Sequence, residues 1–303
     1  MTTFKGIASF LLAATVVSTL SAESRCPGNA ASVPFRIINL HQMIVPVSVN
    51  HSGPYSFLLD TGTQMTMVDP SLAVSLRLAS EGTAEVVSVG MHATASFTRL
   101  NLLETGAHSV ANQKILVYDL KNLQTSPLGI RGVLGEDFLE QFDMLIDNAH
   151  HLLCLDQAGA IRAAVKGTRV ALENPASSTN DAILSKSLIV VARLSDGRRP
   201  VRLKLDSGTN VPFLYNTDDC MALGLFRGAS LRGGSSRSQA NFMALPLQSV
   251  TIGSVEILKV PFVTLVGPQK DSHTGPFDGL LTLGLFRSVF IDHADHFAVL
   301  QPW

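Results

Sequence analysis

The chain has little charge, few aromatic residues and very little cysteine. Of its 303 residues, 16% are charged and 6% are aromatic, whereas about 25% charged residues is typical of globular chains. Lys and Arg together number 23 and Asp and Glu 24, so the net charge is −1. This balance excludes a nucleic-acid binder that works through bulk positive charge, because no surplus of cations exists to neutralise phosphates. The hydrophobic content of 46% excludes a disordered chain.

Long hydrophobic runs are also absent, apart from one near the N-terminus. Residues Ile7 to Leu20 form an apolar stretch of 14 residues, shorter than the roughly 20 residues that a membrane-spanning helix needs. Lys5 precedes this stretch and the small residues Ser21 and Ala22 follow it, as in an export signal. We therefore expect residues 1–24 to be a signal peptide, with no stable membrane insertion after its removal. The mature protein is expected to be secreted or periplasmic.

Cysteine is limited to three residues, Cys26, Cys154 and Cys220. This odd number fits no disulfide framework. An exported chain can form disulfides, so one bridge and one free thiol remain an open alternative. Cys154 lies in the apolar run His-Leu-Leu-Cys-Leu, which favours a buried small side chain at this position. No pattern indicates a catalytic cysteine.

The chain contains an internal repeat. Residues Asn50–Thr63 align without gaps with Asp196–Thr209, and 196 − 50 gives an offset of 146. Residues Ile146–Leu155 likewise correspond to Ile291–Leu300 at an offset of 145. Repeats of solenoid proteins are about 20–50 residues long, so this longer repeat indicates a duplicated domain. We expect an N-terminal lobe, a linker and a C-terminal lobe over residues 25–160, 161–182 and 183–303.

Each copy of the repeat is mostly strand. Short runs of Val, Ile, Phe and Thr recur between Gly, Asn and Pro residues. One short helix is predicted to start at Pro70, with Asp69 as its N-cap, and long amphipathic helices are absent from the pattern. The expected fold is all-β, with two lobes related by an approximate two-fold axis.

Two loops carry the candidate chemistry, and each follows an apolar strand. They are Asp60-Thr61-Gly62-Thr63 and Asp206-Ser207-Gly208-Thr209. Glycine lets one loop approach the other closely, and the hydroxyls can hydrogen-bond within and between the loops. A two-fold axis between them would bring Asp60 and Asp206 face to face, where two carboxylates share one proton. One would act as general base for a water and the other as general acid.

We therefore predict Asp60 and Asp206 as the catalytic residues. Six neighbours are expected to support them: Thr61, Gly62, Thr63, Ser207, Gly208 and Thr209. The hydroxyls of Thr63 and Thr209 are each expected to hydrogen-bond to the aspartate of their own loop. A hydrogen bond to the charged form lowers the pKa of a carboxyl group.

The paired loops resemble those of aspartic peptidases of the pepsin and retropepsin class. The chain is most similar to a bacterial secreted protein with two retropepsin-like lobes, over residues 43–155 and 183–300. The resemblance implies two pseudo-symmetric β-barrel lobes with a central cleft, and two apolar residues and a glycine behind each loop. Val133-Leu134-Gly135 matches that element, whereas Leu280-Leu281-Thr282 has Thr in place of Gly, and Gly284 offers a glycine two residues later.

The resemblance also implies a flap hairpin over the cleft. Val87–Ala95 in the first copy and Leu231–Arg237 in the second occupy suitable positions. It implies peptide or protein substrates. Single-lobe relatives must dimerise to assemble the aspartate pair, so a chain that already joins two lobes is expected to be a monomer.

Three other functions compete with a peptidase. An inactive relative could bind peptide or carbohydrate in its cleft. A glycosidase would place its two carboxylates about 5–9 Å apart, whereas a symmetric duplication predicts a closer pair. The pairs His150-His151 and His293…His296 could hold a metal, but their repeated position after a strand favours polar hairpin turns. We expect no metal and no cofactor.

Overall fold

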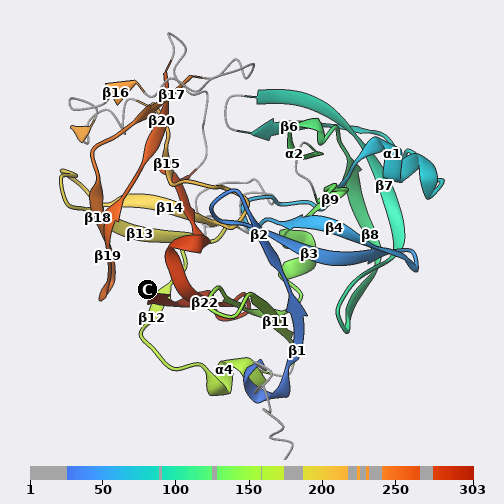
Figure 1. Ribbon diagram of the computed structural model, residues 1–303, viewed down its shortest axis with the longest axis horizontal. Coiled ribbons are helices and arrows are strands. Elements are labelled where there is room, and N and C mark those ends of the chain that lie inside the picture. Colours follow the sequence, from blue (N-terminus) through green and yellow to red (C-terminus); the bar gives the residue numbers. More distant parts are fainter. Residues whose placement is uncertain are drawn as a thin grey trace, which may run out of the picture.

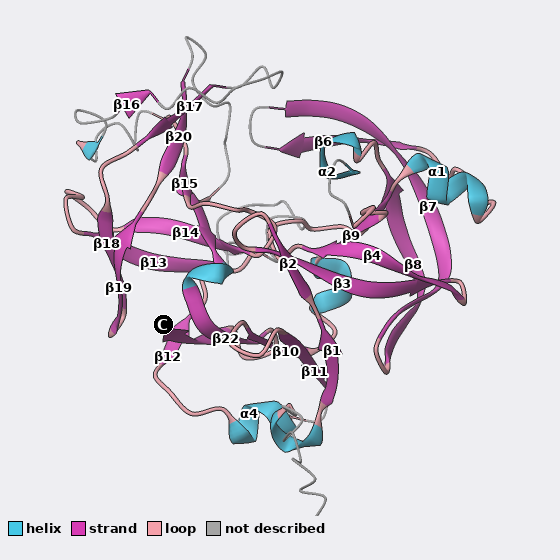
Figure 2. Cartoon of the chain, viewed as in Figure 1, coloured by secondary structure: helices cyan, strands magenta, loops and turns pink. Residues whose placement is uncertain are grey.

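The structure of the chain is a computed structural model. It describes residues 26–88, 91–124, 128–157, 159–173, 187–217, 224–225, 230–231, 241–266 and 276–303. Strands dominate this part of the chain and the helices are short (Figure 2). The expected all-β fold with two lobes is confirmed, because the strands form one sheet in each lobe and a third sheet common to both. The predicted signal peptide lies outside the described residues.

The first lobe contains an eight-stranded sheet in the order β2-β3-β4-β9-β5-β8-β7-β6 (Figure 1). Its strands are β2 (Arg36–Ile38), β3 (Gln42–Val49), β4 (Ser52–Leu59), β5 (Met67–Val68), β6 (Thr83–Ser88), β7 (Met91–Thr105), β8 (His108–Val117) and β9 (Gly132–Leu134). Three short helices accompany it: α1 (Pro70–Ser75), α2 (Lys121–Gln124) and α3 (Glu136–Leu139). The helix predicted at Pro70 is confirmed, since the Asp69 carboxylate accepts hydrogen bonds from the backbone N–H groups of Ser71 and Leu72.

The second lobe contains a nine-stranded sheet in the order β16-β17-β20-β15-β21-β14-β13-β18-β19. Its strands are β13 (Ile189–Leu194), β14 (Val201–Asp206), β15 (Phe213–Leu214), β16 (Ser230–Leu231), β17 (Asn241–Ala244), β18 (Gln248–Ile252), β19 (Val255–Val260), β20 (Val263–Val266) and β21 (Gly279–Thr282). A 3-10 turn, η5 (Leu283–Leu285), follows β21. One continuous cluster of buried apolar side chains extends through both lobes.

The third sheet joins the lobes in the order β1-β11-β10-β22-β23-β12, below them in Figure 1. Its strands are β1 (Ala31–Pro34), β10 (Asp143–Asp147), β11 (Leu152–Asp156), β12 (Arg169–Ala171), β22 (Phe286–Asp292) and β23 (Phe297–Pro302). The turn η1 (Pro27–Asn29) and helix α4 (Ala160–Ala164) complete the elements.

The pairing of β10 with β22 reveals the symmetry of the molecule. These antiparallel strands place Leu145 directly opposite Phe290. The two residues differ in number by 145, which is the offset of the repeat in this region. Equivalent residues that face each other across an antiparallel pair are related by a two-fold axis that passes between them. The expected two-fold axis therefore passes between these two strands.

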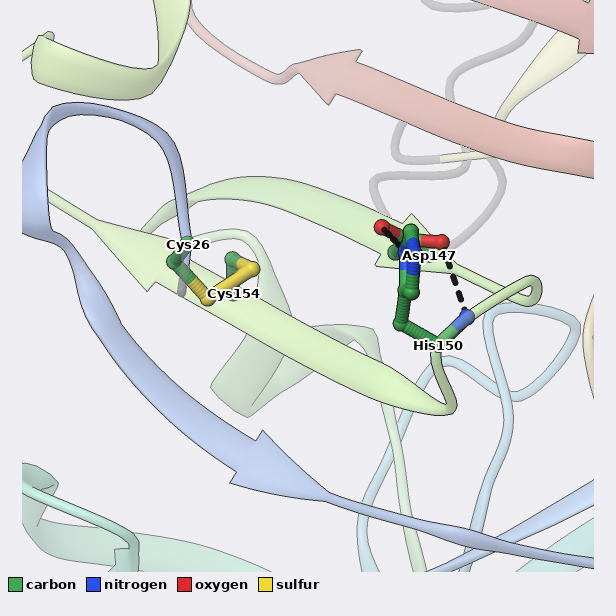
Figure 3. Close-up of a disulfide and its surroundings, with 4 residues drawn as sticks. All are labelled: Cys26, Asp147, His150 and Cys154. Atoms are coloured by element: carbon green, nitrogen blue, oxygen red, sulfur yellow. Dashed lines mark hydrogen bonds and ion pairs between the residues drawn. A yellow bond between two sulfur atoms is a disulfide. The ribbon is translucent and has the colours of Figure 1, made fainter. Parts of the chain in front are cut away.

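A disulfide ties the start of the described chain to this central sheet. Cys26 is bonded to Cys154 in β11, with their Cα atoms 5.6 Å apart (Figure 3). Both residues are buried among apolar side chains, including Ile161 of α4 and Phe290. The preference for Cys154 as a simple buried side chain was therefore wrong, because β1 pairs with β11 and brings Cys26 next to it. Cys220 lies outside the described residues.

The first part of the predicted linker forms regular secondary structure. The last part of α4 and all of β12 lie within residues 161–173, and β12 pairs with β23. Residues 174–182 lie outside the described residues. Within the described ranges, no helix has the length and apolar character required to span a bilayer.

Candidate active site

Each candidate loop leaves the end of a strand that has a parallel neighbour. In the first lobe β4 runs parallel to β9, with Leu59 beside Leu134, and the Asp60 N–H donates to the Leu134 carbonyl at 3.0 Å. In the second lobe β14 runs parallel to β21, with Asp206 beside Thr282. The predicted apolar elements behind the loops are confirmed. They are inner strands of each sheet and hold the two aspartates in place.

The second residues of the loops interlock across the lobe boundary. The Thr61 hydroxyl donates to the Leu205 carbonyl at 3.0 Å and accepts from the Ser207 N–H at 3.0 Å. The Ser207 hydroxyl donates to the Leu59 carbonyl at 2.8 Å and accepts from the Thr61 N–H at 3.1 Å. Both side chains are fully buried. These four reciprocal hydrogen bonds fix the position of one loop relative to the other.

The glycines of the loops allow the two carboxylates to meet. A Cβ atom on Gly62 would lie 2.4 Å from Cγ of Asp206, and one on Gly208 would lie 2.4 Å from Cγ of Asp60. Each carboxylate therefore packs on the glycine of the opposite loop, where no larger residue fits. The two carboxyl groups lie close enough for each to shift the pKa of the other. The structure thus brings together the two aspartates that the repeat predicted.

The aspartate pair holds a proton far above the usual pH range of a carboxyl group. Burial, followed by the neighbouring Asp60 charge, raises the pKa of Asp206 to about 7. Burial also raises the pKa of Asp60, although part of its side chain reaches solvent. The N–H groups of Gly62 and Gly208 each donate to the aspartate of their own loop at 2.8 Å and oppose these shifts. Two carboxylates in contact cannot both ionise readily, so the pair shares one proton.

Comparisons with known proteins agree with this geometry. Residues 45–138 match a family model described as aspartyl protease. The chain is similar to the crystal structure of aspartic proteinase from Irpex lacteus, with a TM-score of 0.55 and 15% sequence identity. That match covers 90% of this chain and 97% of the other. No curated protein sequence matches.

The fold is that of an aspartic proteinase. The predicted resemblance to the pepsin and retropepsin class is therefore confirmed. The family match lies in the first lobe, whereas the fold match extends over both.

The fourth residue of both loops is threonine, but the two hydroxyl groups have different surroundings. The Thr63 side chain lowers the pKa of the Asp60 carboxyl group, in the expected direction. The Thr209 hydroxyl instead donates to the Val211 carbonyl at 3.0 Å. The expectation for Thr209 was therefore wrong, because its single hydroxyl proton is used within its own turn. Asp206 receives the Thr209 backbone N–H at 3.0 Å instead.

Behind the second loop, Thr282 takes the place of the glycine usual in aspartic proteinases. Its hydroxyl donates to the Thr209 carbonyl at 2.8 Å, and its side chain is fully buried. Gly284 lies in η5 against the ring of His41, so it does not take the place of the missing glycine behind the second loop. In the first lobe, a Cβ atom on Gly135 would lie 2.8 Å from the backbone of Met65. The exchange of Gly for Thr therefore supports the second loop rather than weakening it.

Sequence reasoning missed two charged residues beside the aspartate pair. Lys204 precedes the second loop in β14 and is 5% exposed. Glu136 follows Gly135 and is fully buried, and its carboxylate lies 3.1 Å from Nε2 of His293. The available signal was a charged residue where the other copy has leucine, since Leu58 corresponds to Lys204 at the offset of 146.

The histidines considered as metal ligands have partners other than the two aspartates. His150 caps the turn after β10, with its backbone N–H and its Nδ1 atom 3.1 and 2.7 Å from the Asp147 carboxylate (Figure 3). His293 is bonded to Glu136 and to the Phe142 carbonyl. Among the described residues, no group of three His, Cys, Asp or Glu side chains has metal-site geometry.

One of the two predicted flap segments is a hairpin in the described chain. Strands β6 and β7 pair with Val87 opposite His92 and Ser88 opposite Met91. Residues 89–90 lie outside the described residues. For the other segment, Leu231 ends β16, and residues 232–237 lie outside them as well.

Proposed function

We propose that this chain is an exported aspartic endopeptidase that hydrolyses peptide bonds in peptide or protein substrates. One observation carries the proposal: each aspartate packs on the glycine of the opposite loop, which brings the two carboxyl groups close together. Neither an oxidant nor a group donor is needed for hydrolysis, since water is the only co-substrate. The aspartic-proteinase fold supports the same reaction class.

The singly protonated pair supplies an acid and a base at one place. The ionised carboxylate takes a proton from a water as the water oxygen attacks the scissile carbonyl carbon. The protonated carboxyl group gives its proton to the carbonyl oxygen, which forms a tetrahedral diol. As the diol collapses, the C–N bond breaks, the carboxyl group that took the water proton gives it to the leaving nitrogen, and the other carboxylate takes a proton from a diol hydroxyl. The shared proton of Asp60 and Asp206 is then restored.

Export and a monomeric state are parts of the same proposal. The apolar N-terminal segment supports export. The Cys26–Cys154 disulfide supports it further, because such bonds persist in oxidising compartments. The two loops come from one chain and interlock within it, which supports activity as a monomer.

The test is hydrolysis of an unfolded protein by the purified mature chain from pH 3 to pH 8, with and without a pepstatin-type inhibitor. We expect inhibitor-sensitive cleavage that declines above about pH 7, where Asp206 loses its proton. The Asp60→Asn and Asp206→Asn variants serve as matched controls for contaminating peptidases. No cleavage at any pH by a folded wild-type protein would contradict the proposal, and retained inhibitor binding would then favour an inactive peptide-binding protein.

A further inference from the structure

Lys204 occupies a position that the fold does not require to be charged. It lies in β14 opposite Ile189 of β13 and Leu280 of β21, both buried and apolar. The equivalent position in the first lobe holds Leu58, which is 3% exposed in an apolar cluster. Burying an ammonium group costs several kcal/mol unless other groups compensate it. Lys204 therefore needs specific partners.

The ammonium group of Lys204 reaches across the lobe boundary. Its Nζ atom donates to the Gly62 carbonyl at 2.5 Å, and the ring of Phe277 lies 5.5 Å from it. Gly62 is the residue on which the Asp206 carboxylate packs. The carbonyl of Gly208 on the other side accepts a hydrogen bond of 2.7 Å from Gln42, which is neutral. Both loops are thus held by a donor from the opposite lobe, but only one donor carries charge.

Three carboxyl groups face this ammonium group: Asp206, Asp60 and Glu136. Glu136 is in turn bonded to His293. Burial lowers the pKa of Lys204, and the three carboxylates oppose that shift. In the opposite direction, the Lys204 charge lowers the pKa of both aspartates. The strands on either side of Lys204 contribute only Ile189 and Leu280 at its level.

We propose that Lys204 is a positioning residue for the aspartate pair: its ammonium group, fixed on the Gly62 carbonyl, locks the first loop to the second lobe and balances the negative charge of the pair. Its effect on activity rests on the proposed peptidase function, whereas its effect on the charge of the pair does not. Gln42 gives the matching neutral anchor on the other loop.

The first test compares the pH dependence of kcat/KM in three variants. Lys204→Met removes both the charge and the donor, Lys204→Gln keeps a donor, and Gln42→Met removes the neutral donor. We expect both Lys204 variants to move the alkaline limb of the kcat/KM profile to higher pH by about one unit. A nearby cation lowers a carboxyl pKa by at least that much, so its removal raises the pKa. Gln42→Met should lower kcat/KM without moving the limb. Unchanged limbs in both Lys204 variants, or an equal shift in Gln42→Met, would overturn the proposal.

The second test needs no activity and measures the thermal unfolding midpoint from pH 4 to pH 8. Without the Lys204 charge, ionisation of the aspartates destabilises the folded state more. The unfolding midpoint of Lys204→Met should therefore fall more than that of wild type as pH rises from 4 to 8. The extra loss should shrink in an Asp60→Asn, Asp206→Asn background, as in a double-mutant cycle. Lys204→Gln replaces Lys204→Met if the latter does not fold. Identical pH dependence in wild type and variant would overturn the proposal, whereas an inactive wild type that keeps the expected dependence would overturn only the peptidase function.

Discussion

Three features of the loop after β4 are missing from the loop after β14. Gly135 lies behind the first loop, Lys204 donates a hydrogen bond to its Gly62 carbonyl, and Thr63 lowers the pKa of its aspartate. Thr282 backs the second loop, Gln42 holds it, and the Thr209 hydroxyl turns away from Asp206. The hydrogen bonds between Thr61 and Ser207 are nevertheless reciprocal. The two copies thus agree where the loops meet and differ in the groups around each carboxylate.

This difference shows which part of the repeat is constrained by geometry. The interlocked hydroxyls and the facing glycines must match, because each serves the loop of the other lobe. The surrounding groups can differ, because each one acts on a single loop. Two carboxyl groups with related positions thereby acquire unequal electrostatic surroundings, as separate acid and base roles require.

The largest effects are expected from Asp60→Asn and Asp206→Asn. Each should lower kcat by about 10³-fold or more, and the double variant should be no worse than either one, because acid and base act as a unit. Peptide cleavage by titrated, purified protein measures this loss. Near-full activity in either single variant would show that the two loops do not form one catalytic pair.

The same variants should gain stability at alkaline pH. The raised pKa of Asp206, about 7, means that ionisation costs stability as pH rises from the unfolded value near 4 through about 7. An asparagine removes this cost, so the unfolding midpoint of Asp206→Asn should exceed that of wild type at pH 8. The difference should vanish below about pH 4. A lower midpoint at pH 8 would contradict the assignment of a destabilising buried charge.

Alanine substitutions at Gly135 and Thr282 test how the glycine behind the first loop and the threonine behind the second contribute to stability. Gly135→Ala should destabilise the protein by about 3 kcal/mol, because its Cβ atom would lie within 3 Å of the backbone at Met65 and Thr66. Thr282→Ala should cost about 1 kcal/mol through loss of the bond to the Thr209 carbonyl. Urea unfolding measures both values. Equal costs would mean that the two loops are backed in the same way.

Substitution of the interlocked hydroxyls tests the symmetric part of the comparison. Thr61→Val and Ser207→Ala should each cost about 2 kcal/mol, because each removes the hydroxyl partner of an N–H and a carbonyl in the other lobe. The controls Thr61→Ser and Ser207→Thr keep the hydroxyl and should retain most of the stability. Urea midpoints that differ strongly between the two deletions would show that one lobe alone maintains the contact.

The smallest effect is expected at the fourth loop position. Thr63→Ala should move the pH–activity profile to higher pH by less than about one unit, because the Thr63 side chain favours the charged form of Asp60. Thr209→Ala should leave the profile in place, since its hydroxyl bonds to Val211. Profiles of kcat/KM for both variants measure the difference. A shift of the same size in Thr209→Ala would restore the symmetric expectation.

The repeat allowed the fold and the aspartate pair to be predicted from the sequence. Leu145 and Phe290 correspond in the repeat at an offset of 145, and Thr61 and Ser207 at an offset of 146, and strand pairing and hydrogen bonds bring each pair together. A duplicated chain repeats its geometry wherever the residues match. Positions that match in the two copies are therefore the ones that sequence comparison within the chain can interpret.

The unpredicted features lie where the copies differ. Lys204 and Thr282 correspond to Leu58 and Gly135 in the first lobe, which are residues of a different kind, so the repeat carries no information about their partners. The direction of the Thr209 hydroxyl depends on the turn that exposes the Val211 carbonyl. Three cysteines allow three possible single bridges, and only the register of β1 on β11 selects the one between Cys26 and Cys154.

That bridge has an unequal effect on the unfolded chain. It closes a segment with a sequence separation of 128 residues, which contains the whole first sheet. Loop closure of this length reduces the conformational entropy of the unfolded chain by an amount worth about 5 kcal/mol at 25 °C. The described residues of the second lobe include no cysteine, so they gain no such restraint. Reduction of the protein should therefore weaken the half of the molecule that contributes Asp60 more than the described part of the half that contributes Asp206.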